Sequence, residues 1–259
     1  MEELARRFAA AKPDVVVIAT PHNVHISGAM AVIIAGRIAG ELPGAPVTVA
    51  LDSPVDHELA IAILQEWGEG GVPAVGVSFG ANDPLAAVAP MDWGALIPLW
   101  FMGGRSKPPI PVVVIAPSRD LSAEDHIRAG SVIADVAKAT HRRVAFIASA
   151  DHGHAHDADG PYGFDPASAE YDRLICELVR NHRLDELADI PLGFVERAKA
   201  DSWWQMLFLH GATKISWSAE LLSYETPTYF GMLTAAYTPA TRGTSSRLRK
   251  RTQRRTRAS

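Results

Sequence analysis

The sequence predicts an α/β protein with one central, mostly parallel or mixed sheet and helices on both of its faces. Short, continuous apolar runs alternate with longer segments in which apolar residues recur every three or four positions, as βαβ units require. The chain has 259 residues, 47% of them hydrophobic and 21% charged, which is enough to bury one large core. No internal repeat or linker precedes residue 241, so we expect one domain over residues 1–240.

The predicted strands are short apolar runs bounded by turn residues. Residues 14–20 (DVVVIAT) form a continuous β-branched run, which is typical of a strand buried on both faces. Residues 110–118 and 143–150 repeat this pattern, and residues 46–52 and 72–78 are two further strand candidates. We expect these runs to form the sheet.

The segments between these runs have helical periodicity. Apolar residues recur at spacings of three and four in residues 57–70, 123–140 and 167–182. We therefore expect these three segments to form helices that cover the sheet.

Composition excludes several classes of protein. No run approaches the ~20 apolar residues that a membrane helix needs, and the first residues lack the apolar centre of a secretory signal. We expect a soluble, cytoplasmic protein with no membrane partner. The single cysteine, Cys176, excludes an internal disulfide and lies in a helical pattern, where a buried thiol is expected.

The charge is distributed unevenly between the body of the chain and its end. Residues 241–259 contain seven Arg, one Lys and no acidic residue, which leaves 17 basic against 29 acidic residues, a net charge of −12, for the rest. The basic segment has no aromatic residue to stack on bases and no apolar periodicity. We expect a solvated, disordered tail and no nucleic-acid partner.

Histidines follow two of the predicted strands. His22 comes after residues 14–20, and His152, His154 and His156 come after residues 143–150. In open α/β sheets ligands bind at the carboxyl ends of the strands, where loops converge. The three clustered histidines could be metal ligands, an acid/base device or a solvated polar loop, and the two groups could form one site.

Three stretches carry, in order, a resemblance to a known family: residues 13–25, 72–99 and 146–172. They resemble the class III extradiol ring-cleavage dioxygenases, the superfamily of the protocatechuate 4,5-dioxygenase beta subunit, and the similarity extends from Ala11 to Ala212. The resemblance implies a central sheet with helices on both sides. It also implies an oxidoreductase of aromatic compound catabolism that uses Fe(II) and O₂ to open a small catechol-type or aminophenol-type ring, in a homo-oligomer.

The same resemblance implies roles for individual residues. His22, in the turn TPHNVH, matches a metal ligand, and His154 matches the acid/base histidine, with Asp151 as its orienting neighbour. The carboxylate ligand falls before the segment SWWQMLFLHGA, where Asp201 is the nearer match and Glu196 the alternative. Three protein ligands on one face of Fe(II) leave positions for both substrate and O₂.

Two departures from the family pattern keep other functions open. The chain begins inside a helix of the family, so we expect one strand and the first metal histidine to be absent from it. Trp93 stands where the family has the histidine of an Asp-His-Gly motif, and an indole can neither accept a proton nor bind iron. The alternatives are a metal-dependent hydrolase on the same scaffold and a non-catalytic subunit or degenerate homologue. The residues leave the roles of His152 and His156 unassigned.

Overall fold

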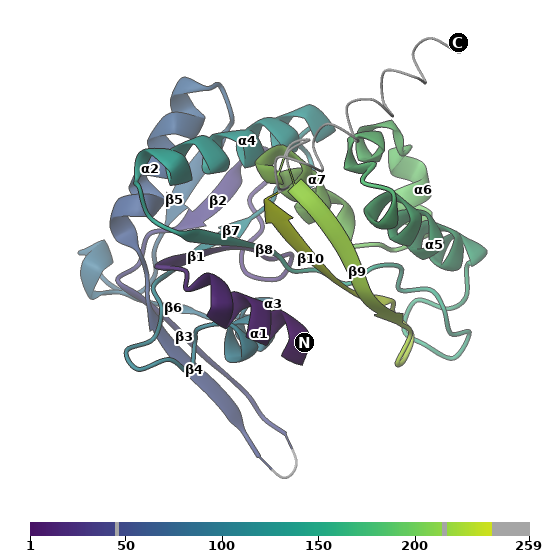
Figure 1. Cartoon of the computed structure of the whole chain (residues 1–259), viewed down its shortest axis with the longest axis horizontal. Coiled ribbons are helices and arrows are strands. Elements are labelled where there is room, and N and C mark those ends of the chain that lie inside the picture. The colour runs from purple at the N-terminus through teal and green to yellow at the C-terminus, as the bar shows by residue number, and fades with distance from the viewer. Residues whose placement is uncertain (45–46, 214–216, 240–259) are drawn as a thin grey trace.

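The computed structural model describes residues 1–44, 47–213 and 217–239, and its centre is a five-stranded sheet of order β5-β2-β7-β1-β8 (Figure 1). β7, β1 and β8 are parallel to one another, as are β2 and β5, whereas β2 is antiparallel to β7. The sheet is therefore mixed, and the predicted fold class is confirmed. The strands are β1 Val15–Ala19, β2 Met30–Ile33, β5 Ala74–Val77, β7 Val112–Ala116 and β8 Val144–Ala148.

The middle strands of the sheet are buried on both faces. Every residue of β1 and β7 is buried, which explains why their sequences are continuous β-branched runs without alternation. β8 lies at the edge of the sheet and is only partly buried along its length. The strand predictions for residues 14–20, 72–78, 110–118 and 143–150 are confirmed.

One face of the sheet is covered by helices α2, α4 and α7. The Trp67 indole N–H donates to the Ala129 carbonyl at 3.0 Å and so joins α2 to α4. Gly130 and Gly211 let α4 and α7 approach closely, because a Cβ at either position would lie 2.0 Å from a backbone oxygen of the other helix. These helices are α2 His57–Glu69, α4 Ala123–Ala139 and α7 Ser202–Thr213.

A three-stranded sheet of order β4-β3-β6 and helix α3 cover the opposite face (Figure 1). The strand predicted over residues 46–52 falls in β4, so its assignment to the central sheet is wrong. Its buried Leu51 packs with residues of β1 and α3 across the face of the central sheet, and the strand extends neither edge of that sheet. The elements here are α1 Glu2–Ala11, β3 Arg37–Leu42, β4 Val49–Pro54, 3₁₀ helix η1 Pro84–Ala86, β6 Val88–Pro90 and α3 Trp93–Phe101.

A second core lies beside β8. Helix α5 was expected to cover the central sheet, but it packs against α6, the 3₁₀ helix η2 and strand β9. Its apolar face, which includes Tyr171, Ile175 and Leu178, finds partners there and on α7. Figure 1 shows the antiparallel β9–β10 hairpin beside this group. The elements are α5 Pro166–Arg180, η2 Leu184–Asp189, α6 Leu192–Arg197, β9 Trp217–Glu225 and β10 Met232–Pro239.

Local sequence fixes where most helices begin. The side chains of Asp56, Asp92, Ser122 and Asp165 accept hydrogen bonds from backbone N–H groups in the first turns of α2, α3, α4 and α5. The three predicted helices are confirmed as helices. In the described ranges, no helix is both long and apolar enough to cross a bilayer. The predicted tail, residues 241–259, lies outside the described residues.

Candidate functional site

Three parallel strands end at one edge of the central sheet, and polar residues follow each of them. His22 follows β1, Arg119 follows β7, and Asp151 and His154 follow β8, which pairs directly with β1. Asp201, immediately before α7, joins them through an ion pair with Arg119. We call these five residues the strand-end site. The prediction that His22 and His154 follow strands that end at the same edge is confirmed by this arrangement.

His154 is held by hydrogen bonds that fix its ring. Its Nδ1 lies 2.7 Å from the Lys199 carbonyl oxygen, which can only accept, so Nδ1 carries the proton. Its backbone N–H donates to the Ala198 carbonyl at 3.0 Å. Nε2 faces Asp151, with its carboxylate oxygen 3.6 Å away, too far for a direct hydrogen bond. Nε2 is therefore the nitrogen of His154 that can take up and release a proton.

The surroundings of His154 favour its protonated form. Burial opposes the charge, but the neighbouring carboxylates of Asp151 and Asp201 and the Lys199 carbonyl outweigh that effect and raise the pKa of His154. Both His154 and Asp151 are buried. The two carboxylates that favour the charged imidazole come from different segments, Asp151 from the loop after β8 and Asp201 from the residue before α7.

Aromatic rings surround His154. The centroids of Tyr162, Phe230 and Tyr229 lie 5.6, 5.7 and 6.1 Å from the centroid of its ring. Tyr229 and Phe230 belong to the loop between β9 and β10. Gly231 of this loop exchanges backbone hydrogen bonds with the loop after β8. We call these three rings the aromatic wall. His154, the predicted proton-transfer residue, is therefore surrounded by the apolar faces and edges of aromatic rings.

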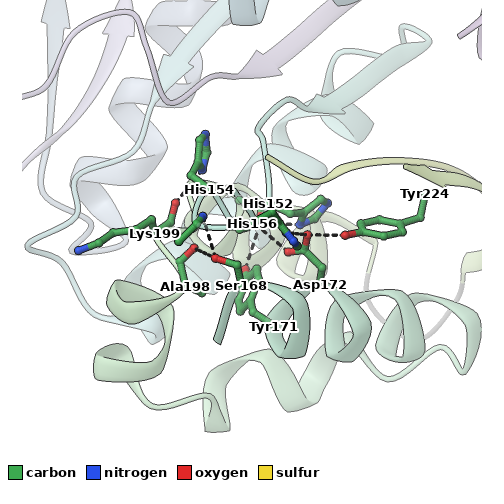
Figure 2. Close-up of polar contacts among 12 residues, drawn as sticks. His152, His154, His156, Ser168, Tyr171, Asp172, Ala198, Lys199 and Tyr224 are labelled. Atoms are coloured by element: carbon green, nitrogen blue, oxygen red, sulfur yellow. Dashed lines mark hydrogen bonds and ion pairs between the residues drawn. The ribbon is translucent and has the colours of Figure 1, made fainter. Parts of the chain in front are cut away.

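The two other clustered histidines are anchored away from the strand-end site. His152 is buried, and its Nδ1 lies 2.8 Å from the Ser202 hydroxyl. Burial lowers the pKa of His152 and keeps it neutral. His156 donates through Nε2 to buried Asp172 at 2.9 Å. Figure 2 shows the His154 ring pointing away from this second group, so the three histidines form no single cluster of ligands.

The loop after β1 is organised around Asp92 of the Met91–Gly94 turn. Asp92 accepts from the Thr20 hydroxyl at 2.7 Å and from the Asn23 amide at 3.2 Å, while it also caps α3. The Trp93 ring stacks on His22, with the centroids 4.3 Å apart. His22 Nε2 is buried and has no hydrogen-bond partner. A buried imidazole nitrogen without a partner is a feature expected of a metal ligand in the absence of its metal.

The two candidate carboxylates lie in different settings. Asp201 is largely buried and is paired with Arg119, whose guanidinium also lies over the Trp204 ring, 4.9 Å from its centroid. Glu196 is exposed on α6. Of the two, only Asp201 belongs to the strand-end site.

Comparison with known proteins assigns the family. The model of the family "Catalytic LigB subunit of aromatic ring-opening dioxygenase" matches residues 1–233. The chain belongs to the LigB family. The resemblance found in the sequence is thereby confirmed, and LigB dioxygenases are in general metal-dependent.

One sequence relative and one solved structure are also similar to this LigB-family chain. It is 26% identical over 231 residues to Protein CA_C1420 of Clostridium acetobutylicum, a match that covers 86% of this chain and 48% of that protein. The chain thus spans about half the length of this curated relative. The crystal structure of uncharacterized protein JW3007 from Escherichia coli K12 superposes with a TM-score of 0.60 at 14% identity and covers 91% of each chain. At that identity the likeness shows a shared fold.

The fit of the LigB-family donor set to a metal ion is partial. His22 Nε2 suits a ligand, but nowhere in the part of the chain that the structure describes do three His, Cys, Asp or Glu side chains converge as a metal site. The arrangement therefore does not assemble His22 with Asp201 or Glu196 into three ligands. The ligand roles of these three residues stay predictions.

Sequence reasoning missed several residues that shape the site. Lys199 acts through its backbone carbonyl, which no side-chain pattern reveals. The aromatic wall residues Tyr229 and Phe230 come from a hairpin that was not predicted. Asp172 ends the stretch FDPASAEYD that carried the family resemblance, and its place within an otherwise apolar helix face was the signal that could have identified it.

Proposed function

We propose that this chain is the catalytic domain of an Fe(II)-dependent extradiol dioxygenase that opens a catechol-type or aminophenol-type ring with O₂. The observation that carries the proposal is the tautomer of His154, whose Nδ1 is fixed by a carbonyl and whose Nε2 is left for proton exchange at the edge of the sheet. Membership of the LigB family supports the reaction class.

The aromatic wall supports a flat, aromatic substrate. A ring placed beside Tyr162, Tyr229 and Phe230 could stack or make edge contacts with these rings, as aromatic groups do at separations of about 4.5–7 Å. A substrate hydroxyl next to His154 Nε2 would then have a base within reach. Arg119, which pairs with Asp201, would attract an anionic substituent.

His154 supplies the proton chemistry in this proposal. Neutral Nε2 accepts the proton of a substrate hydroxyl on binding, and the imidazolium that forms is stabilised by Asp151 and Asp201. The same proton can be returned later to a developing oxyanion. Asp151 acts as a positioning residue, because it faces Nε2 while the Lys199 carbonyl holds the opposite nitrogen.

Fe(II) would bring the substrate oxygens and O₂ to one centre and pass electron density between them. His22 is the residue whose unpartnered Nε2 fits such an ion, and Asp201 is the expected carboxylate, ahead of Glu196. Because three donors do not converge in the described residues, we assign no reaction step to the metal.

The test is anaerobic reconstitution of the full chain with Fe(II), followed by mixing with catechols or aminophenols and O₂. We expect oxygen uptake matched one to one by a yellow ring-fission product. Fe(II)-independent turnover, or hydrolysis of esters supported by Zn²⁺ without oxygen uptake, would contradict the dioxygenase and favour the hydrolase. His25→Ala, at an exposed histidine of the same loop as His22, is a control that should keep full activity.

A second candidate function is binding of an aromatic ligand without ring opening. It is favoured by Trp93, which replaces the histidine of the family's Asp-His-Gly motif and whose indole stacks on His22. Saturable binding of a catechol by the reconstituted chain, with no oxygen uptake, would support this non-catalytic role.

A further inference from the structure

A second group of polar residues is formed by helix α5, strand β9 and the loop after β8. They surround an open hollow of about 380 Å³, whose lining includes Arg173, Cys176 and Arg180 of α5, His156, and Tyr224 and Thr226. Figure 2 shows His156 and Tyr224 converging on Asp172 at the back of this group, while His154 points elsewhere. The hollow is therefore distinct from the strand-end site.

Hydrogen bonds to Asp172 hold two of the residues that line the hollow, His156 and Tyr224. Asp172 is 1% exposed and accepts from the Tyr224 hydroxyl at 2.6 Å, the Gly153 backbone N–H at 2.7 Å and His156 Nε2 at 2.9 Å. Burial and the carboxylate of Asp172 raise the pKa of Tyr224, so its hydroxyl stays protonated as a donor. These bonds hold the His156 ring in one orientation and fix the proton on Nε2.

The orientation of His156 leaves its other nitrogen for a ligand. Nδ1 has no hydrogen-bond partner within the described ranges, and His156 lines the hollow. In the tautomer that carries its proton on Nε2, the Nδ1 of an imidazole is a hydrogen-bond acceptor. A ligand group that donates a hydroxyl would satisfy it.

The residues that line the hollow include two guanidinium groups, and the carboxylates of Asp172 and Glu177 contact lining residues from outside it. Arg173 and Arg180 both line it, and none of the residues that line it is Asp or Glu. Arg173 touches Glu177 only at 4.0 Å, and Arg180 forms no ion pair in the portion of the chain that is described. Guanidinium groups bind oxyanions through paired N–H donors, so two of them beside one hollow favour a group with several negatively charged oxygens.

The Cys176 thiol does not make the hollow a nucleophilic site. Burial raises the pKa of this thiol to about 11, which keeps it protonated near neutral pH. It makes no hydrogen bond to His156, and its neighbour Arg180 lowers that pKa less than burial raises it. The group is suited to binding and not to covalent catalysis.

We propose that this hollow binds a phosphate group, free or as a monoester. Phosphate combines the features that the residues require: oxygens that accept from Arg173, Arg180 and the Thr226 hydroxyl, and, as the monohydrogen form, one O–H that donates to His156 Nδ1. A carboxylate near neutral pH lacks that donor. The hollow is open to solvent, so the remainder of a small monoester can extend out of it.

The experiment is a titration of the full chain at constant ionic strength with inorganic phosphate, glycerol phosphate and acetate, followed by NMR of the arginine and histidine side chains. We expect saturable shifts at Arg173, Arg180 and His156 with phosphate. Tighter binding of glycerol phosphate than of phosphate assigns the site to monoesters, and the reverse order assigns it to the free ion. No saturable shift, or acetate binding as tight as phosphate, would overturn the proposal.

Variants separate the site from general charge effects. Arg180→Gln should weaken phosphate binding about tenfold, because a charge-assisted bond is lost. Arg128→Gln removes the same charge from the exposed side of α4 and should leave the dissociation constant unchanged. His156→Gln can keep a donor toward Asp172 and should also weaken binding. Equal affinities of the Arg180 and Arg128 variants would contradict the assignment. None of these residues belongs to the strand-end site, so a failed dioxygenase assay would not affect this test.

Discussion

The loops after β1 and β8 begin side by side at one edge of the sheet, but the hydrogen bonding of their histidine rings differs. In the loop after β8, each imidazole has one nitrogen fixed: His152 by Ser202, His154 by the Lys199 carbonyl and His156 by Asp172. In the loop after β1, the ring of His22 stacks on Trp93, and its buried Nε2 has no partner among the described residues.

This difference separates two chemical tasks. A fixed tautomer defines which nitrogen exchanges a proton, and that is what acid/base chemistry needs. A buried nitrogen without a partner is costly to leave unsatisfied and suits a ligand that arrives later. The comparison therefore supports the proposals that His154 transfers a proton and that His22 binds a ligand.

The largest expected effect comes from removing the proton-transfer residue. His154→Ala should lower turnover about 100-fold or more, the usual loss when a general acid/base is removed, while iron and substrate binding remain. Single-turnover mixing of the anaerobic Fe(II)–substrate complex with O₂ separates binding from chemistry. Loss of iron from this variant would show that His154 is a ligand and would contradict the distinction drawn between the two loops.

Asp172 anchors the loop after β8, so its replacement should lower the stability of the fold. Asp172→Ala leaves three buried or partly buried donors without an acceptor and should lower the free energy of unfolding by roughly 2–3 kcal/mol. Asp172→Asn keeps an acceptor oxygen and should cost less. Urea unfolding curves measure both. Equal stability of Asp172→Ala and the parent chain would show that the loop is not held in this way.

His22 should matter for metal and not for stability. His22→Ala removes the unpartnered nitrogen and should weaken Fe(II) binding at least about tenfold, or ~1.4 kcal/mol, with the fold intact. His25→Ala, three residues further along, is the matched control. Anaerobic titration of Fe(II) into both variants gives the dissociation constants, and identical values would refute the ligand role.

The smallest effect is a change of stability with pH, and it has opposite signs at neighbouring histidines. Because the folded-state pKa of His154 is raised, its contribution is complete below the unfolded value of about 6.5 and is lost as the pH rises through the folded value. His152, whose pKa is lowered, contributes above about 6.5 and loses that contribution as the pH falls. Unfolding of the parent and His154→Gln should therefore differ most near pH 5.5 and least near pH 8.5. A difference that grows with pH would contradict this sign.

The sequence was sufficient for the parts of the fold that local patterns specify. Continuous β-branched runs identified β1 and β7, because only strands buried on both faces tolerate such runs. Strand β2, with the four residues MAVI, carries no turn residue that sets it apart from the apolar residues that follow. The position of β4 in a second sheet depends on the packing of its Leu51 against residues distant in sequence, which local patterns do not specify.

The site could be predicted only where a side chain acts by its own chemistry. His22, His154, Asp151 and Asp201 were identified because they follow strands or match family positions, and the carboxylates of Asp151 and Asp201 both favour the charged form of His154. The Lys199 carbonyl could not be found, since its role depends on the path of the backbone before α7. No sequence pattern indicates that Asp201 pairs with Arg119, which is 82 residues away.

The measurement that tests the central claim most directly is a ¹⁵N NMR pH titration of the histidine side chains in the full chain. We predict that neutral His154 carries its proton on Nδ1, donated to Lys199, and that its pKa lies above the ordinary value of about 6.5. Asp151→Asn should lower that pKa. A neutral His154 protonated on Nε2, or a pKa below the ordinary value, would contradict the proton-transfer role proposed for it.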